Sequence, residues 1–104
     1  YKYFVDMIAG GAVEVAVMVP AGASSHTYEP TPKQMIAASQ ADIWFYLGES
    51  FEAKAREALK AHNPQMVFTD LRQNVDLIKT HHCAIHSGCE DLHIWTSPKM
   101  SKIQ

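Results

Sequence analysis

The spacing of hydrophobic and polar positions predicts a helix and then a strand in the first 20 residues. Residues 1–9 place their large apolar side chains on one helical face, and Gly10 can adopt the left-handed conformation common at helix ends. From residue 13 to residue 19 every second residue is valine, and this period of two is typical of a strand. Pro20 cannot donate the next backbone hydrogen bond. We therefore expect a helix over residues 1–9 and a strand over residues 13–19.

A turn-rich passage and a capped helix are expected next. His26 lies near the middle of residues 21–30, which are rich in turn-forming side chains. Thr31 then opens a Thr-Pro-Lys-Gln sequence, in which the threonine hydroxyl and the Gln34 side chain can each bond an open backbone amide. This signature predicts a helix over residues 32–40.

A second strand and helix follow at short distance. The continuous apolar run over residues 43–47 is typical of a strand buried on both faces. Ser50 is expected to cap the next helix, whose apolar stripe recurs at helical spacing until Asn63. On its solvent side, Glu52 and Arg56 have the spacing of an ion pair.

The last third of the chain is less regular. Residues 66–68 predict a third short strand, and residues 74–79 fit a helical turn and an extended link equally well. Ser97 and Pro98 repeat the cap-plus-proline signature, so another helix is expected to begin there. Strands that alternate with helices favour an α/β fold with a parallel sheet flanked by helices.

Composition narrows the class of protein. A chain of 104 residues that is 47% hydrophobic is the size of one small domain with a core. Nine basic and eleven acidic side chains give a charge of -2, and no basic cluster is interleaved with aromatics, so we expect no nucleic-acid partner. The longest apolar runs, residues 15–19 and 43–47, are far shorter than the roughly 20 residues of a membrane span.

Candidate chemistry is concentrated in residues 80–95, which read THHCAIHSGCEDLHIW. Imidazole and thiolate suit zinc and neighbouring transition metals, so a metal site is the first hypothesis. Three alternatives stay open: a His-rich surface loop without a fixed ligand set, a Cys83–Cys89 disulfide, and a structural zinc site within the loop. The ligands of that structural site would be Cys83, His86, Cys89 and His93.

Two segments together resemble a known family. The run from Gly22 to Pro32, GASSHTYEPTP, resembles the first metal-ligand motif of the solute-binding proteins that serve zinc and manganese ABC transporters. Asp91-Leu-His93-Ile-Trp, followed by Ser97-Pro98, resembles their second motif. The two motifs stand in the order of the family, and the resemblance covers nearly the whole chain.

The resemblance implies a metal site and a two-lobed protein. It makes His26 and His93 the metal ligands, and it places the other histidines in the accessory loop of zinc-type members: His81, His82 and His86. It implies two α/β lobes joined by a long helix, of which residues 1–104 would be the amino-terminal lobe without its first strand. Leu92 departs from the family, which usually has proline there.

The function implied is high-affinity zinc capture outside the cytoplasm and delivery to an ABC-transporter permease. The protein would be periplasmic or a lipoprotein anchored to the outer face of the cytoplasmic membrane. Zinc is expected over manganese because manganese accepts more oxygen ligands than this histidine-rich sequence offers. Acid should favour release, because an imidazole, whose ordinary pKa is about 6.5, must be neutral to bind a metal.

Several further expectations concern the neighbours of the two histidines. If the carboxyl ends of the parallel strands meet at one edge, His26 and the His/Cys stretch converge there. Glu29, Asp91 or a backbone carbonyl could then accept the second imidazole N–H. A metalloenzyme is the remaining alternative, but the chain contains none of the common catalytic motifs, such as His-Glu-x-x-His. A sheet without its opening strand leaves unpaired positions, so we also expect some self-association of this piece.

Overall fold

The computed structural model describes residues 1–80, 89–97 and 99, and a pair of parallel strands lies at the centre of its fold. β1 (Ile43–Tyr46) and β2 (Val67–Asp70) pair in register from Ile43 opposite Val67 to Tyr46 opposite Asp70. α3 (Ser50–His62) is the crossover between them. The predicted strand–helix–strand unit and its parallel pairing are therefore confirmed, with β2 displaced toward the carboxyl end from residues 66–68.

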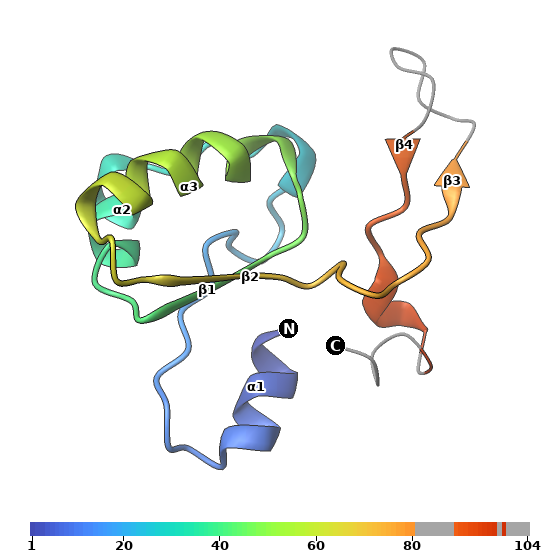
Figure 1. Ribbon diagram of the computed structural model, residues 1–104, viewed down its shortest axis with the longest axis horizontal. Helices are drawn as coiled ribbons and strands as arrows, with labels where there is room; N and C mark the ends of the chain where they lie inside the picture. The colour runs from blue at the N-terminus through green and yellow to red at the C-terminus, as the bar shows by residue number, and fades with distance from the viewer. Residues whose placement is uncertain (81–88, 98, 100–104) are drawn as a thin grey trace.

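α3 covers one side of this strand pair, together with α2 (Pro32–Ala38) (Figure 1). Leu59, only 1% exposed, and Ala55 are buried on the inner side of α3, and Met66 is buried just before β2. Arg56 lies over the Tyr46 ring at 4.7 Å, and Lys60 lies over the Phe68 ring at 5.3 Å. The apolar stripe of α3 thus builds the core, and its basic side chains lie along the aromatic face of the strands.

Three expectations for α3 and its strand are wrong. Glu52 does not pair with Arg56 on the solvent side, because it is buried and its carboxylate accepts backbone N–H groups of the preceding turn. The residue that caps α3 is Glu49, not Ser50. β1 is not buried on both faces either, since Ile43 and Phe45 are 49% and 43% exposed. Among the described residues, only the α3 side of the strand pair is covered.

The expected strand over residues 13–19 does not form. This stretch has no ladder partner in the described part of the chain, and a strand exists only where its backbone groups pair with a neighbour. Alternation alone could not reveal this. A side-chain bond from Gln34 to the carbonyl oxygen of Met18, at 3.2 Å, fastens the end of the stretch to α2 instead.

α1 (Lys2–Ala9) confirms the first predicted helix, and Gly10 follows it with a φ of 56°. The capping box that begins α2 is also confirmed: Gln34 N bonds the Thr31 hydroxyl at 3.3 Å, and Thr31 N bonds the Gln34 side chain at 2.9 Å. α2 ends before residue 40, where the Asn63 side chain donates to the carbonyl oxygens of Ser39 and Ala41.

An antiparallel hairpin that the sequence did not predict follows β2. It consists of β3 (Lys79–Thr80) and β4 (Cys89–Glu90), and it leads into a short 3-10 helix, η2 (Ile94–Thr96). Residues 74–78 have no regular secondary structure, which settles their ambiguity in favour of the extended link. The helix expected from Ser97–Pro98 falls largely outside the described residues. In the part of the chain that the structure describes, no helix has the length and apolarity to cross a membrane.

Acid should weaken the fold through one ion pair at the carboxyl end of β2. Arg72 bonds both carboxylate oxygens of Asp70, at 2.9 and 2.7 Å, and these bonds hold the pKa of Asp70 below its usual range. A depressed pKa stabilises the fold above the ordinary aspartate pKa of about 3.9, and that contribution is lost as pH falls through the lower pKa of the folded state. Urea unfolding of Arg72→Gln between pH 6 and pH 2 should therefore show a shallower acid slope than wild type. Lys33→Gln removes an exposed cation as a control, and an equal change in both variants would contradict this assignment.

Candidate metal site

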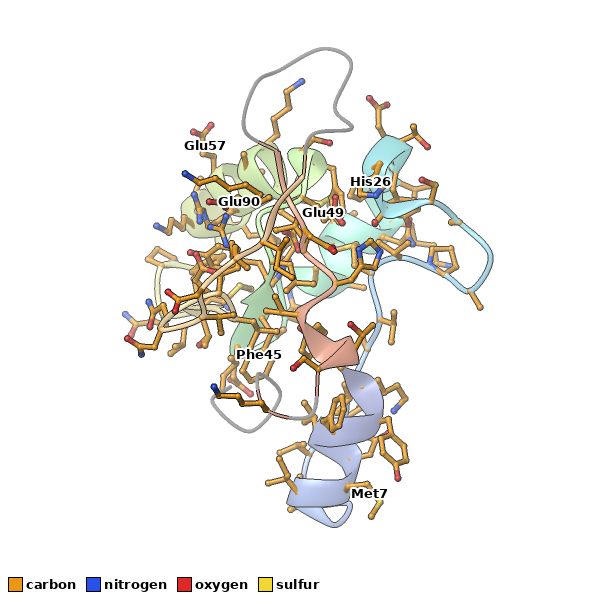
Figure 2. All side chains as sticks on the ribbon, turned by 90° about the vertical axis from the view of Figure 1, so that its right-hand side faces the viewer. Met7, His26, Phe45, Glu49, Glu57 and Glu90 are labelled. Carbon is orange, nitrogen blue, oxygen red and sulfur yellow. The ribbon has the colours of Figure 1, made fainter. Side chains whose placement is uncertain are left out.

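His26 lies in a 3-10 turn, η1 (Ser25–Thr27), that contacts the amino-terminal end of α3. Its ring Nδ1 is 3.1 Å from Glu49 Oε2, and the Ser25 hydroxyl donates to Glu49 Oε1 at 2.7 Å. The His26 side chain is 66% exposed and the Glu49 side chain only 10%. Figure 2 shows the two residues beside each other, with His26 at the rim of the molecule. A nearly buried carboxylate thus holds an exposed imidazole.

His93 has the same kind of partner from its own segment. Asp91 Oδ1 accepts the backbone N–H of His93 at 2.9 Å and lies 2.7 Å from the ring Nδ1. The backbone N–H, and then the ring, keep the pKa of Asp91 below its usual range, so this carboxylate stays ionised beside the imidazole at neutral pH. Asp91 is therefore placed to accept the second imidazole N–H of His93, as expected.

Glu29, the other candidate carboxylate, is an exposed side chain, and the partner of His26 is Glu49. Sequence reasoning missed Glu49 because the motif that contains His26 does not contain it. A signal was present all the same. Glu49 is the third residue after β1, and the carboxyl ends of parallel strands are where site residues gather.

The rings of His26 and His93 lie together, with centroids 6.5 Å apart and ring planes at 68°. The predicted convergence of the two motifs is therefore confirmed. Because a carboxylate can only accept at neutral pH, each Nδ1 carries the proton, and this tautomer places the lone pair of each ring on Nε2. Two neighbouring imidazoles in this tautomer have the chemistry to share one divalent cation.

Two imidazole ligands would make up about half of a closed site. Zinc in such a site takes about four N, S or O ligands. No group of three or more histidine, cysteine, aspartate or glutamate side chains in the described part of the chain is arranged to hold a metal ion. The remaining ligands would have to come from elsewhere in the protein. A small cavity of about 150 Å³ also borders His93, but His26 does not line it.

Several predicted residues cannot be placed. His81, His82, His86 and Cys83 lie outside the described residues, and so do the proposed disulfide and the local zinc site that depend on them. Two other side chains, one aromatic and one imidazole, have structural partners instead. Tyr28 packs against Phe51 with ring centroids 5.4 Å apart. His62 Nδ1 donates to the Ala58 carbonyl oxygen at 2.9 Å, close to the carboxyl end of α3, where a histidine is a favourable partner for the helix dipole.

Comparison with known proteins identifies the family. Residues 1–104 match the family model described as ZnuA: Zinc-uptake complex component A periplasmic. This chain belongs to that family. A crystal structure of ZnuA superposes with a TM-score of 0.81 and 37% identity, over 97% of this chain and 38% of that one. The α/β fold, a short parallel sheet flanked by helices, therefore matches part of the ZnuA structure.

Curated relatives agree with this assignment. A Chlamydia muridarum protein named "Putative metal-binding protein" is 35% identical over 104 residues, which are 100% of this chain and 36% of the relative. FimA of Streptococcus parasanguinis, a metal ABC transporter substrate-binding lipoprotein, is 32% identical over 96 residues, 85% of this chain and 30% of the relative. The chain thus spans about a third of the length of these relatives.

Family membership decides the class of function. The family consists of solute-binding proteins that bind zinc or manganese for ABC transporters, and its members are periplasmic or membrane-anchored lipoproteins. They are not enzymes, so the metalloenzyme alternative is set aside.

Proposed function

We propose that the protein containing this chain captures zinc outside the cytoplasm and delivers it to the membrane permease of an ABC transporter. The observation that carries the proposal is the pairing of His26 with His93, whose ring centroids are 6.5 Å apart. Each ring has its Nδ1 on a carboxylate, which favours metal binding through Nε2. In this proposal the two histidines are ligands, and Glu49 and Asp91 orient them.

Residues 1–104 form the amino-terminal lobe in this proposal, and a second lobe supplies the remaining ligands. The length of the relatives supports it, because the chain covers only 36% of the Chlamydia muridarum protein. The open face of β1 and the unpaired stretch over residues 13–19 support a further strand in the whole protein, and they also favour self-association of this piece alone. A site divided between lobes couples metal capture to closure, since only the closed form completes the coordination shell.

Zinc is the proposed cargo because both ligands from this lobe are imidazole nitrogens. Manganese prefers carboxylate, carbonyl and water oxygens. Manganese is the second candidate, because the PsaA relatives of Streptococcus pneumoniae and Streptococcus anginosus are named as manganese ABC transporter proteins. The choice between the metals depends on the ligands that the second lobe contributes.

Metal titration of the full-length protein tests this proposal. Calorimetry of the metal-free protein with Zn²⁺ should show tight, saturable binding, and a tenfold excess of Mn²⁺ should not displace the zinc. If manganese displaces the zinc, manganese is the transported metal instead. The absence of saturable binding of either metal would overturn the proposal.

A further inference from the structure

Glu52 is the one buried charged residue among the described residues, and the metal-site chemistry above makes no use of it. We propose that Glu52 is a positioning residue for the metal site: it holds the turn over residues 47–49 in the conformation that brings Glu49 to His26. This inference rests on the proposed function, in which His26 is a ligand. It assigns a role to a side chain that does not itself touch the metal.

The carboxylate of Glu52 accepts hydrogen bonds from all three backbone N–H groups of the turn. Its Oε2 accepts from Leu47 at 3.1 Å, from Gly48 at 2.7 Å and from Glu49 at 2.7 Å. Glu52 is only 8% exposed, and burial raises the pKa of its carboxyl group, against the opposing effect of these three bonds. Because all three N–H groups donate to one buried oxygen, the turn cannot move far without breaking hydrogen bonds and leaving that oxygen unsatisfied.

The Arg72 guanidinium group lies close to the centre of the turn. Gly48 has a φ of 91°, and a Cβ atom at this position would collide with that group. The guanidinium is itself fixed by two bonds to Asp70, at 2.9 and 2.7 Å. Both the left-handed φ and this close approach favour glycine at the centre of the turn.

The restrained turn ends at Glu49, which connects it to the metal site. Glu49 Oε2 faces His26 Nδ1 at 3.1 Å, and Oε1 accepts from Ser25 in the same 3-10 turn as His26. If the turn relaxes, this carboxylate leaves Nδ1, and the imidazole loses the acceptor that keeps its proton there. Glu52 thus acts on the tautomer of His26 through the backbone of the turn and the side chain of Glu49.

The test uses the full-length protein with two substitutions at one position. Glu52→Ala removes the acceptor, whereas Glu52→Gln keeps one oxygen that can occupy the place of Oε2. Zn²⁺ calorimetry should show about tenfold weaker binding for Glu52→Ala, the effect typical of losing an outer-shell partner, and binding close to wild type for Glu52→Gln. In the metal-free protein, the ring ¹⁵N shifts of His26 should show a mixture of tautomers for Glu52→Ala and one dominant tautomer for Glu52→Gln.

Two controls separate positioning from general destabilisation. Glu57→Ala removes an exposed charge from the same helix, and Leu59→Ala removes core packing from it. Both should leave the His26 ring shifts and the zinc affinity unchanged at a temperature where the variants are folded. Unchanged affinity in Glu52→Ala, or equal losses in Glu52→Ala and Leu59→Ala, would overturn the positioning role. If His26→Ala also binds zinc normally, the proposed function fails, and this inference fails with it.

Discussion

Replacing either His26 or His93 with alanine should weaken zinc binding by the full-length protein by more than about 100-fold. The loss should exceed the 10- to 100-fold that an outer-shell partner typically contributes, because each substitution removes a donor atom. The two variants should lose similar affinity, since the rings lie together and each has a carboxylate on Nδ1. The double variant should lose little more than the singles if a site without one imidazole no longer closes around the ion.

His62→Ala is the matched control for this experiment. Its ring is also exposed, but its Nδ1 bonds the Ala58 carbonyl oxygen within α3, so it should leave zinc affinity unchanged. Zinc calorimetry at neutral pH measures all four variants. Wild-type zinc affinity in both single variants would contradict the assignment of His26 and His93 as ligands. Weaker zinc binding by His62→Ala would mean that exposed histidines bind zinc without a defined site.

Leu59→Ala should have the largest effect on stability, about 2–5 kcal/mol of the free energy of unfolding. Leu59 is 1% exposed, the most completely buried large side chain among the described residues, and it lies on α3, which covers the strand pair. Its truncation removes buried apolar contacts and leaves a cavity that the surrounding side chains fill only in part. Urea unfolding of the full-length protein, followed by circular dichroism, measures the change.

Ile36→Ala provides the comparison for Leu59→Ala. Ile36 is also an aliphatic residue on a helix, but it is 69% exposed, so its truncation should change stability by less than about 0.5 kcal/mol. Similar effects at the two positions would show that α3 does not supply the core of this lobe.

Local signals predicted where α1, α2 and α3 lie, because helix ends depend largely on neighbours within one turn. The Thr31–Gln34 capping box and the left-handed conformation of Gly10 are both present, although α2 ends at Ala38 rather than residue 40 and Glu49 rather than Ser50 caps α3. The parallel pairing of β1 with β2 was predictable for a related reason. A strand, a helix and a strand joined by short connections return the second strand alongside the first.

Predictions that depended on a choice between competing partners were less successful. The alternation over residues 13–19 has the period of a strand, yet no ladder forms there among the described residues. Glu52 and Arg56 have the spacing of a surface ion pair, but the free backbone amides before α3 take the carboxylate, and the Tyr46 ring takes the guanidinium. Spacing indicates which residues can meet, but it does not rank these competing partners.

The sequence by itself determined the family, the positions of the three α-helices and the two histidines as candidate ligands, because motifs and capping residues lie close together in the chain. Only the tertiary structure decided that Glu49 is the partner of His26 and that one face of β1 remains open among the described residues. The physical reason is that burial and hydrogen-bond partners depend on which segments meet in space. A carboxylate goes to the donors that the fold brings within its reach, wherever they lie in the chain.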